Sequence, residues 1–320
     1  MISLDRAKGA VVGALCGDVC GAPLEMLGRL PSYQEVEEAL TMINGGGIHR
    51  VAPGQITDDG ELTLCQLHGL VDFIQTENYD SIANMYQQWY FSKPFDCGNT
   101  TRTAFRVHHD SNTGISLTQT MKLAAMRNRG SKANGSLMRA TPIGVWGAGK
   151  DKNYVAEIAK LDSSLSHPNQ TCQDAVACYV LAIAYLVEGL SRQETFAKIK
   201  EWAKQNANEE VNEWLHLAEM HDIPAATPSE GFVKIAFVYA FFHLICDHDY
   251  VTAIQHTLIK GGDTDTNACI VGGLIGAAVG VSKIPYYMTT ALFECEPNHN
   301  RPRFLHPIAL HNLFYLLFQK

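Results

Sequence analysis

Two short motifs concentrate carboxylates and hydroxyls in a pattern suited to hard divalent cations. Residues 57–59 read Thr-Asp-Asp, residues 263–266 read Asp-Thr-Asp-Thr, and each motif precedes an apolar segment with helical periodicity. Mg²⁺ and Mn²⁺ prefer oxygen ligands of this kind. Asp and Thr are also ordinary helix N-caps, so capping explains either motif alone about as well as metal binding does.

The segment after the second motif favours the metal interpretation. Gly272, Gly273 and Gly276 interrupt an apolar helix, although glycine has poor helix propensity. We expect these glycines to allow another backbone to approach closely, which would make this a central helix. Carboxylates at the end of a buried helix need a partner charge or a metal, because unpaired burial is costly. The motif itself contains no basic residue, so a metal fits better.

Four further features do not indicate a functional site when each is taken alone. Asp96 begins a turn of small hydrogen-bonding residues, and residues 134–136, Asn-Gly-Ser, could expose N–H groups suited to phosphate. Glu25 and His167 stand alone in the sequence. Taken singly, an Asx turn, an ordinary tight turn and structural side chains explain these residues better.

The elements that must position these residues are predicted to be helices. Ser3 can cap a helix running through Ala14, and apolar residues at spacings of three and four predict helices over 64–74 and 82–89. Alternating β-branched runs are nearly missing, so strands should be scarce. The segments 171–188 and 232–246 are expected to be buried helices, 204–216 a solvated face or excursion, and 44–57, 92–101, 128–136 and 221–231 loops. One all-α domain over 1–320 is the simplest organisation.

Composition narrows the class of protein. A net charge of -8 disfavours nonspecific binding to nucleic acid or anionic membranes. Nine cysteines without a C-x-x-C pattern argue against a disulfide framework and favour a reducing compartment. His243, Cys246 and His248 fit no standard zinc spacing and favour a helix end near solvent. The N-terminus lacks signal-peptide character and no apolar run predicts a membrane span, so we expect a soluble cytoplasmic protein.

Taken together and in order, the motifs resemble the ADP-ribosylglycohydrolase family, and within it most of all the dinitrogenase-reductase-activating type. The resemblance implies a compact orthogonal helical bundle with two Mg²⁺ or Mn²⁺ ions in a central cleft. The matching stretches span nearly the whole chain: residues 13–25, 53–59, 96–101, 134–139, 166–168 and 261–266.

The same resemblance implies a role for particular residues. Asp96 would act at the scissile bond with Glu25 close by. Thr264 stands where alanine is common in the family, and its side chain should point away from the ligands. The implied metal ligands are Thr57, Asp58, Asp59, Asp263, Asp265 and Thr266. The implied ADP-ribose contacts are Asn99, Thr100, Thr101, Asn134, Gly135, Ser136, Met138, His167 and Phe232.

The function that follows as an expectation is metal-dependent hydrolysis of the N-glycosidic bond of ADP-ribosylated arginine on a protein, with release of ADP-ribose. Alternatives are hydrolysis of ADP-ribosyl-serine or of a free ADP-ribosyl metabolite, non-catalytic binding of ADP-ribose, and two-metal phosphoesterase activity that would release AMP. Residues 204–230 and 294–320 match no pattern that identifies a partner.

Overall fold

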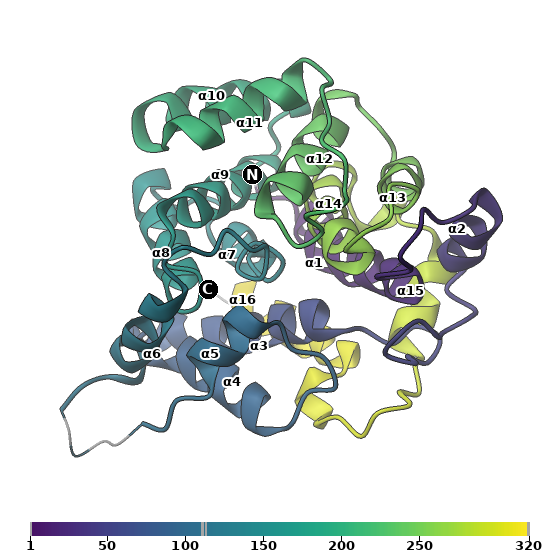
Figure 1. Ribbon diagram of the computed structural model, residues 1–320. Helices are drawn as coiled ribbons and strands as arrows, with labels where there is room; N and C mark the ends of the chain where they lie inside the picture. Colours follow the sequence, from purple (N-terminus) through teal and green to yellow (C-terminus); the bar gives the residue numbers. More distant parts are fainter. Residues whose placement is uncertain (1, 110–111, 113, 319–320) are drawn as a thin grey trace.

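The protein is built from α-helices joined by turns and short 3₁₀ segments, which confirms the predicted all-α class (Figure 1). The computed structural model describes residues 2–109, 112 and 114–318, and within these ranges it contains two isolated β-bridges and no strand. The α-helices are α1 Leu4–Gly21, α2 Tyr33–Leu40, α3 Asp58–Thr76, α4 Asp80–Phe91, α5 Asn99–Phe105, α6 Leu117–Ala125, α7 Thr141–Trp146, α8 Lys152–Ser164, α9 Gln170–Val187, α10 Arg192–Asn206, α11 Glu209–Glu219, α12 Val233–Ile245, α13 Tyr250–Leu258, α14 Thr264–Val279, α15 Tyr286–Phe293 and α16 Leu310–Phe318. The 3₁₀ segments are η1 Ala22–Leu24, η3 Met126–Asn128, η4 Val281–Lys283, η5 Arg303–Leu305 and η6 Pro307–Ala309.

The central helices α1 and α14 run antiparallel in close backbone contact (Figure 1). The facing glycines of α1 recur at every fourth residue, which places them on one side of the helix: Gly9, Gly13, Gly17 and Gly21. A Cβ at Gly17 would lie 2.1 Å from the Ala268 carbonyl oxygen, and one at Gly13 would lie 2.4 Å from that of Gly272. The close approach predicted from the glycines of α14 is therefore confirmed, and it brings the N-terminus of α14 beside the C-terminus of α1.

Apolar helices surround this pair. Helices α9, α12 and α13 pack on α14, and α9 and α12 are buried along most of their length. Two segments, Leu4–Leu24 and Gln170–Val187, are long and apolar enough to cross a membrane, but 89% and 83% of their respective windows are buried within the fold. That burial is the pattern of core helices in a folded domain.

Two predicted loop or surface segments are helical in the structure. Helix α5 begins at Asn99, inside the loop expected over 92–101, and Gly98 is its N-cap. The polar stretch 204–216 forms the end of α10 and most of α11, at the top of Figure 1. Val211 and Trp214 bury one face of α11 while its charged residues remain outside. Amphipathic packing, which a count of charges does not reveal, explains the second difference.

Candidate active site

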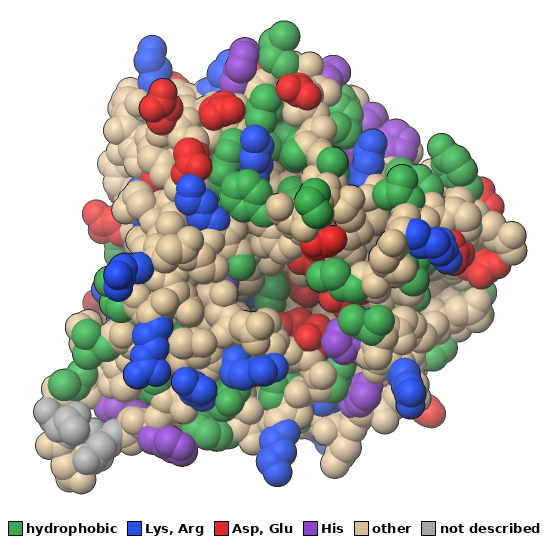
Figure 2. All heavy atoms as spheres, viewed as in Figure 1, with side chains coloured by type: hydrophobic (Ala, Val, Ile, Leu, Met, Phe, Trp, Pro, Cys, Tyr) green, Lys and Arg blue, Asp and Glu red, His purple; other side chains and the backbone are tan. Residues whose placement is uncertain are grey.

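The two acidic motifs meet in one cleft, because α3 and α14 both begin there. Thr266 Oγ1 lies 3.3 Å from Asp59 Oδ2, although 207 residues separate them in the chain. Two overlapping groups of carboxylate oxygens each lie within 4.8 Å of one another: Asp18, Asp59 and Asp265, and Glu25, Asp263 and Asp265. Figure 2 shows acidic side chains gathered at a hollow in the face it displays.

The electrostatics of this cluster favour a cation. Burial, reinforced by neighbouring carboxylates, raises the pKa of Asp58, Asp59 and Asp265 well above the usual value. Burial likewise raises the pKa of Glu25 to about 8. Asp59 Oδ1 is buried without a hydrogen-bond partner among the described residues, and no Lys or Arg side chain is among those that line the cleft. Oxygen donors in such surroundings suit Mg²⁺ or Mn²⁺.

Asp18, which was not among the predicted site residues, organises the first motif. Its carboxylate accepts hydrogen bonds from the backbone N–H groups of Thr57 and Gly60, both at 2.9 Å, and from Thr57 Oγ1 at 2.8 Å. A carboxylate on α1 thus caps the N-terminus of α3. Burial raises the pKa of Asp18 to about 7, against the effect of these hydrogen bonds. The signal in the sequence was a carboxylate in the apolar, glycine-rich second half of α1.

Asp96 and Glu25 are brought together by a histidine that sequence reasoning missed. His49 Nε2 lies 3.1 Å from Glu25 Oε2 and 3.3 Å from Asp96 Oδ2. Glu25 follows η1, Asp96 follows α4, and His49 lies in the loop before the first motif. A lone histidine in a glycine-rich loop carries no pattern that could have identified it.

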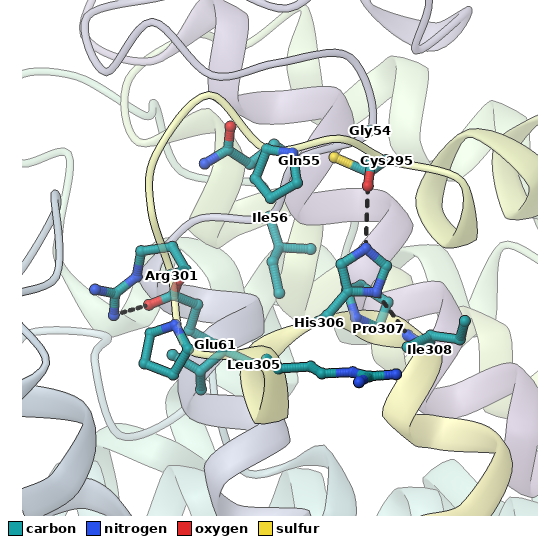
Figure 3. Close-up of a pocket in the computed structure, with 13 residues that line it drawn as sticks. Gly54, Gln55, Ile56, Glu61, Cys295, Arg301, Leu305, His306, Pro307 and Ile308 are labelled. Atoms are coloured by element: carbon teal, nitrogen blue, oxygen red, sulfur yellow. Dashed lines mark hydrogen bonds and ion pairs between the residues drawn. The ribbon is translucent and has the colours of Figure 1, made fainter.

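The C-terminal segment, whose sequence matched nothing, braces this part of the cleft. Arg301 pairs with Glu61 of α3, with Nε 2.7 Å from Oε1, and both side chains are nearly buried (Figure 3). A cavity of about 400 Å³ lies beside this pair, and Figure 3 shows His306 at its wall, bonded to the Cys295 carbonyl. His299 Nε2 lies 2.8 Å from the carbonyl oxygen of His49. The segment therefore holds both α3 and the His49 loop in place.

Most of the residues expected to contact ADP-ribose line the same cleft, which has a volume of about 380 Å³. Those on its wall are Asn99, Thr100, Thr101, Asn134, Gly135, Met138 and His167. Ser136 and Phe232 are not on the wall. Ser136 is buried and accepts a hydrogen bond from Ser163 Oγ at 3.0 Å, and the Phe232 ring lies edge-on to Trp214 with centroids 5.6 Å apart.

Asn134 and His167 are held in fixed positions at the cleft. Asn134 Nδ2 donates to Asp263 Oδ2 at 2.7 Å, which links the middle motif to the second acidic motif. Burial, together with the charge of Arg139, lowers the pKa of His167 to about 3, so its ring is neutral near pH 7. A Cβ at Gly135 would lie 2.9 Å from Cε1 of His167, so only glycine fits beside that ring without displacing it.

Comparison with known proteins identifies the family. The model of the ADP-ribosylglycohydrolase family matches residues 2–314. The chain belongs to this family. It is 27% identical to the ADP-ribosyl-[dinitrogen reductase] glycohydrolase of Rhodospirillum rubrum, over 88% of each chain, which confirms the likeness expected from the motifs.

Two further comparisons agree with this assignment. The ADP-ribosylarginine hydrolase Tri1 of Pseudomonas putida is 27% identical over 88% of this chain and 73% of its own. A solved structure titled ADP-ribosylglycohydrolase-related protein complex superposes with a TM-score of 0.74 at 22% identity, covering 98% of this chain and 97% of that one, so it shares the fold. Family membership supports hydrolysis of an ADP-ribosyl glycosidic bond as the chemistry of this cleft.

Proposed function

We propose that this protein hydrolyses the N-glycosidic bond of ADP-ribosylated arginine on proteins and releases ADP-ribose. The observation that carries the proposal is the Glu25–His49–Asp96 group, which adjoins a buried cluster of carboxylates in a cleft that no Lys or Arg side chain lines. That arrangement offers proton-transfer groups at the edge of a cation site. The likeness to a relative named as an ADP-ribosylarginine hydrolase supports arginine as the modified residue.

The residues of the two acidic motifs fit two Mg²⁺ or Mn²⁺ ions. The Thr57 hydroxyl donates a hydrogen bond to Asp18, and the Thr266 hydroxyl donates one to Asp59. Each hydroxyl oxygen therefore keeps lone pairs that a cation could bind. Asp58, Asp59, Asp263 and Asp265 would supply the carboxylate ligands. Bound ions would neutralise these carboxylates, orient ribose hydroxyls and lower the pKa of a water molecule.

The chain's own residues would manage the proton. When water replaces the guanidine nitrogen at the ribose carbon, the water would lose one proton to Glu25, and that nitrogen must gain one, because guanidine leaves far more readily than its anion. Asp96 would deliver this proton as general acid, and its side chain, 22% exposed, lies nearer solvent than that of Glu25, 11% exposed. His49, between them, would orient Asp96 and exchange protons with Glu25.

The test is release of ADP-ribose from an arginine-modified protein, with Mg²⁺ or Mn²⁺ supplied. Asp96→Asn should lower turnover by about 10²–10⁴-fold, the usual contribution of a general acid or base. The exposed Asp222→Asn is the matched control and should turn over normally. Undiminished turnover by Asp96→Asn would remove Asp96 from the mechanism.

The same assay separates the alternatives. Faster cleavage of a serine-modified peptide or of a free ADP-ribosyl metabolite would reassign the substrate. Release of AMP would indicate attack on the diphosphate. Binding of ADP-ribose without cleavage of any conjugate would identify a non-catalytic binder.

A further inference from the structure

Three histidines gather where the end of α12 meets α13, and none of them lines the cleft. His243 lies near the end of α12, His248 in the following turn and His256 on α13. One ring nitrogen of each lies within 4.8 Å of the others. Cys246, the cysteine between two of them in sequence, instead has its Sγ 3.7 Å from Nε2 of His221. The spacing 243, 248 and 256 becomes a cluster only because α13 folds back against α12.

The hydrogen bonds of Thr257 fix the tautomer of His243. Thr257 Oγ1 donates to the Ala253 carbonyl oxygen at 2.8 Å, so its proton is engaged. In the 3.4 Å contact between Thr257 Oγ1 and His243 Nε2, the ring nitrogen is then the atom with a proton to donate. This leaves a lone pair on Nδ1, which faces His248 Nδ1 at 2.8 Å. His243 is 2% exposed, so Nδ1 offers a buried lone pair to the cluster. Its Nε2–H faces the Thr257 hydroxyl oxygen, much as the free N–H of a metal-bound histidine faces an oxygen of the protein.

We propose that His243, His248 and His256 form a binding site for a late first-row divalent cation, with Zn²⁺ the best fit. A tetrahedral ion with Zn–N bonds of about 2.0–2.1 Å places ligand nitrogens about 3.4 Å apart and imidazole centroids about 5 Å apart. The three centroid separations are 5.1, 5.2 and 6.0 Å. His256 is exposed, so its side chain has room to close the remaining gap.

Binding requires a tautomer change and no net loss of protons. His248, which donates from Nδ1 to His243, would release that hydrogen bond and carry its proton on Nε2 if Nδ1 binds the ion. A water molecule would complete the tetrahedral coordination as the fourth ligand. A cavity of about 260 Å³, lined by His243 and His256, opens beside the site.

The charges around the cluster are balanced, so the ligand type decides which ion binds. Arg192 pairs with Asp247 at 3.0 Å, Asp249 lies close to His248, and Lys260 lines the neighbouring cavity. Imidazole ligands favour Zn²⁺, Ni²⁺ or Cu²⁺, whereas the oxygen-rich cleft favours Mg²⁺ or Mn²⁺. An ion here would tie α12 to α13, the helix that leads through Gly261-Gly262 into the second acidic motif.

The experiment measures Zn²⁺ binding to the full-length, EDTA-treated protein by competition with a chromophoric chelator, and Co²⁺ binding by its d–d absorption. The wild type should bind one equivalent at this site, with the absorption intensity of a tetrahedral ion. His248→Ala and His256→Ala should weaken that equivalent by about 10–100-fold or more. His216→Ala, at an exposed histidine of α11, is the matched control and should bind like the wild type.

Further variants separate this site from the cleft and from misfolding. Asp265→Asn should retain the Zn²⁺ equivalent, and His256→Ala should retain wild-type hydrolysis in Mg²⁺ or Mn²⁺, which also reports that it folds. If His248→Ala and His256→Ala bind Zn²⁺ as tightly as the wild type, or if the only equivalent disappears in Asp265→Asn, the site does not exist. The proposal is independent of the proposed function, so either can fail alone.

Discussion

Two buried carboxylates, Asp162 and Asp59, have opposite surroundings. Asp162 is fully buried, its Oδ2 lies 3.0 Å from Nε of Arg139, and its Oδ1 accepts hydrogen bonds from Tyr79 and Tyr86 at 3.1 and 2.8 Å. Asp59 is 1% exposed, its Oδ1 has no hydrogen-bond partner among the described residues, and its neighbours are carboxylates. The fold pairs the first carboxylate with an internal cation and places the second among carboxylates with no Lys or Arg on the wall of the cleft. Four predictions test this contrast.

The largest effect is expected at the internally paired site. Arg139→Met would leave Asp162 buried without its cation, and removing one partner of a buried pair costs about 3–5 kcal/mol of unfolding free energy. Urea denaturation should show this loss equally with and without divalent cations. Arg127→Met, at an exposed position, is the control. A loss below about 1 kcal/mol would mean that the pair contributes little.

Substitution of a carboxylate in the cleft should reduce activity and not stability. Asp265→Asn should lower hydrolysis by at least about 100-fold, because it removes a proposed metal ligand. In EDTA the same variant should be as stable as the wild type or more stable, because one of several repelling carboxylates is gone. If Asp265→Asn were active but less stable than the wild type, Asp265 would have a structural role like that of Asp162.

A smaller effect should follow pH. Because the folded-state pKa values of Asp18 and Glu25 are raised to about 7 and 8, the metal-free folded protein binds more protons than the unfolded chain above about pH 4. The stability that protonation of these two carboxyl groups contributes is present at low pH and is lost as pH rises towards 8. In EDTA, Tm should fall by at least about 3 °C between pH 5 and pH 8, the shift produced by about 1 kcal/mol.

The fall in Tm should be smaller with Mn²⁺, because the cation stabilises the ionised carboxylates. Thermal denaturation at matched ionic strength, with Ca²⁺-free buffer and either EDTA or Mn²⁺, provides the comparison. Parallel Tm curves in the two buffers would show that the acidic cluster does not bind the ion.

The smallest effect is expected at Thr264, between two proposed ligands. Its hydroxyl donates to the Gly21 carbonyl oxygen at 2.8 Å, so the side chain points to α1, as expected, and not into the cleft. Thr264→Ala should cost about 1 kcal/mol of stability, the net contribution of one buried hydrogen bond. Hydrolysis should stay within about twofold of wild type, and a larger loss would give Thr264 a role in the site.

Much of the helical fold could be predicted from the sequence. The apolar periodicity gave the helical class, and the glycines at 272, 273 and 276 predicted the close contact of α14 with another backbone. Helix α11 was obscured because its charged face outweighed the buried Val211 and Trp214 in composition. The start of α5 at Asn99 was obscured because Asn and Thr are as common in turns as in first helical turns.

By itself the sequence determined that carboxylates stand at the starts of α3 and α14, but not what they do there, because a helix cap and a metal ligand use the same oxygen atoms. Tertiary structure alone decided that the two helix ends meet, that Asp18 caps α3, and that His49 reaches both Glu25 and Asp96. Periodicity reports which face of a helix is buried. It does not report which distant residues share a site, since this depends on how helices far apart in the chain pack against one another.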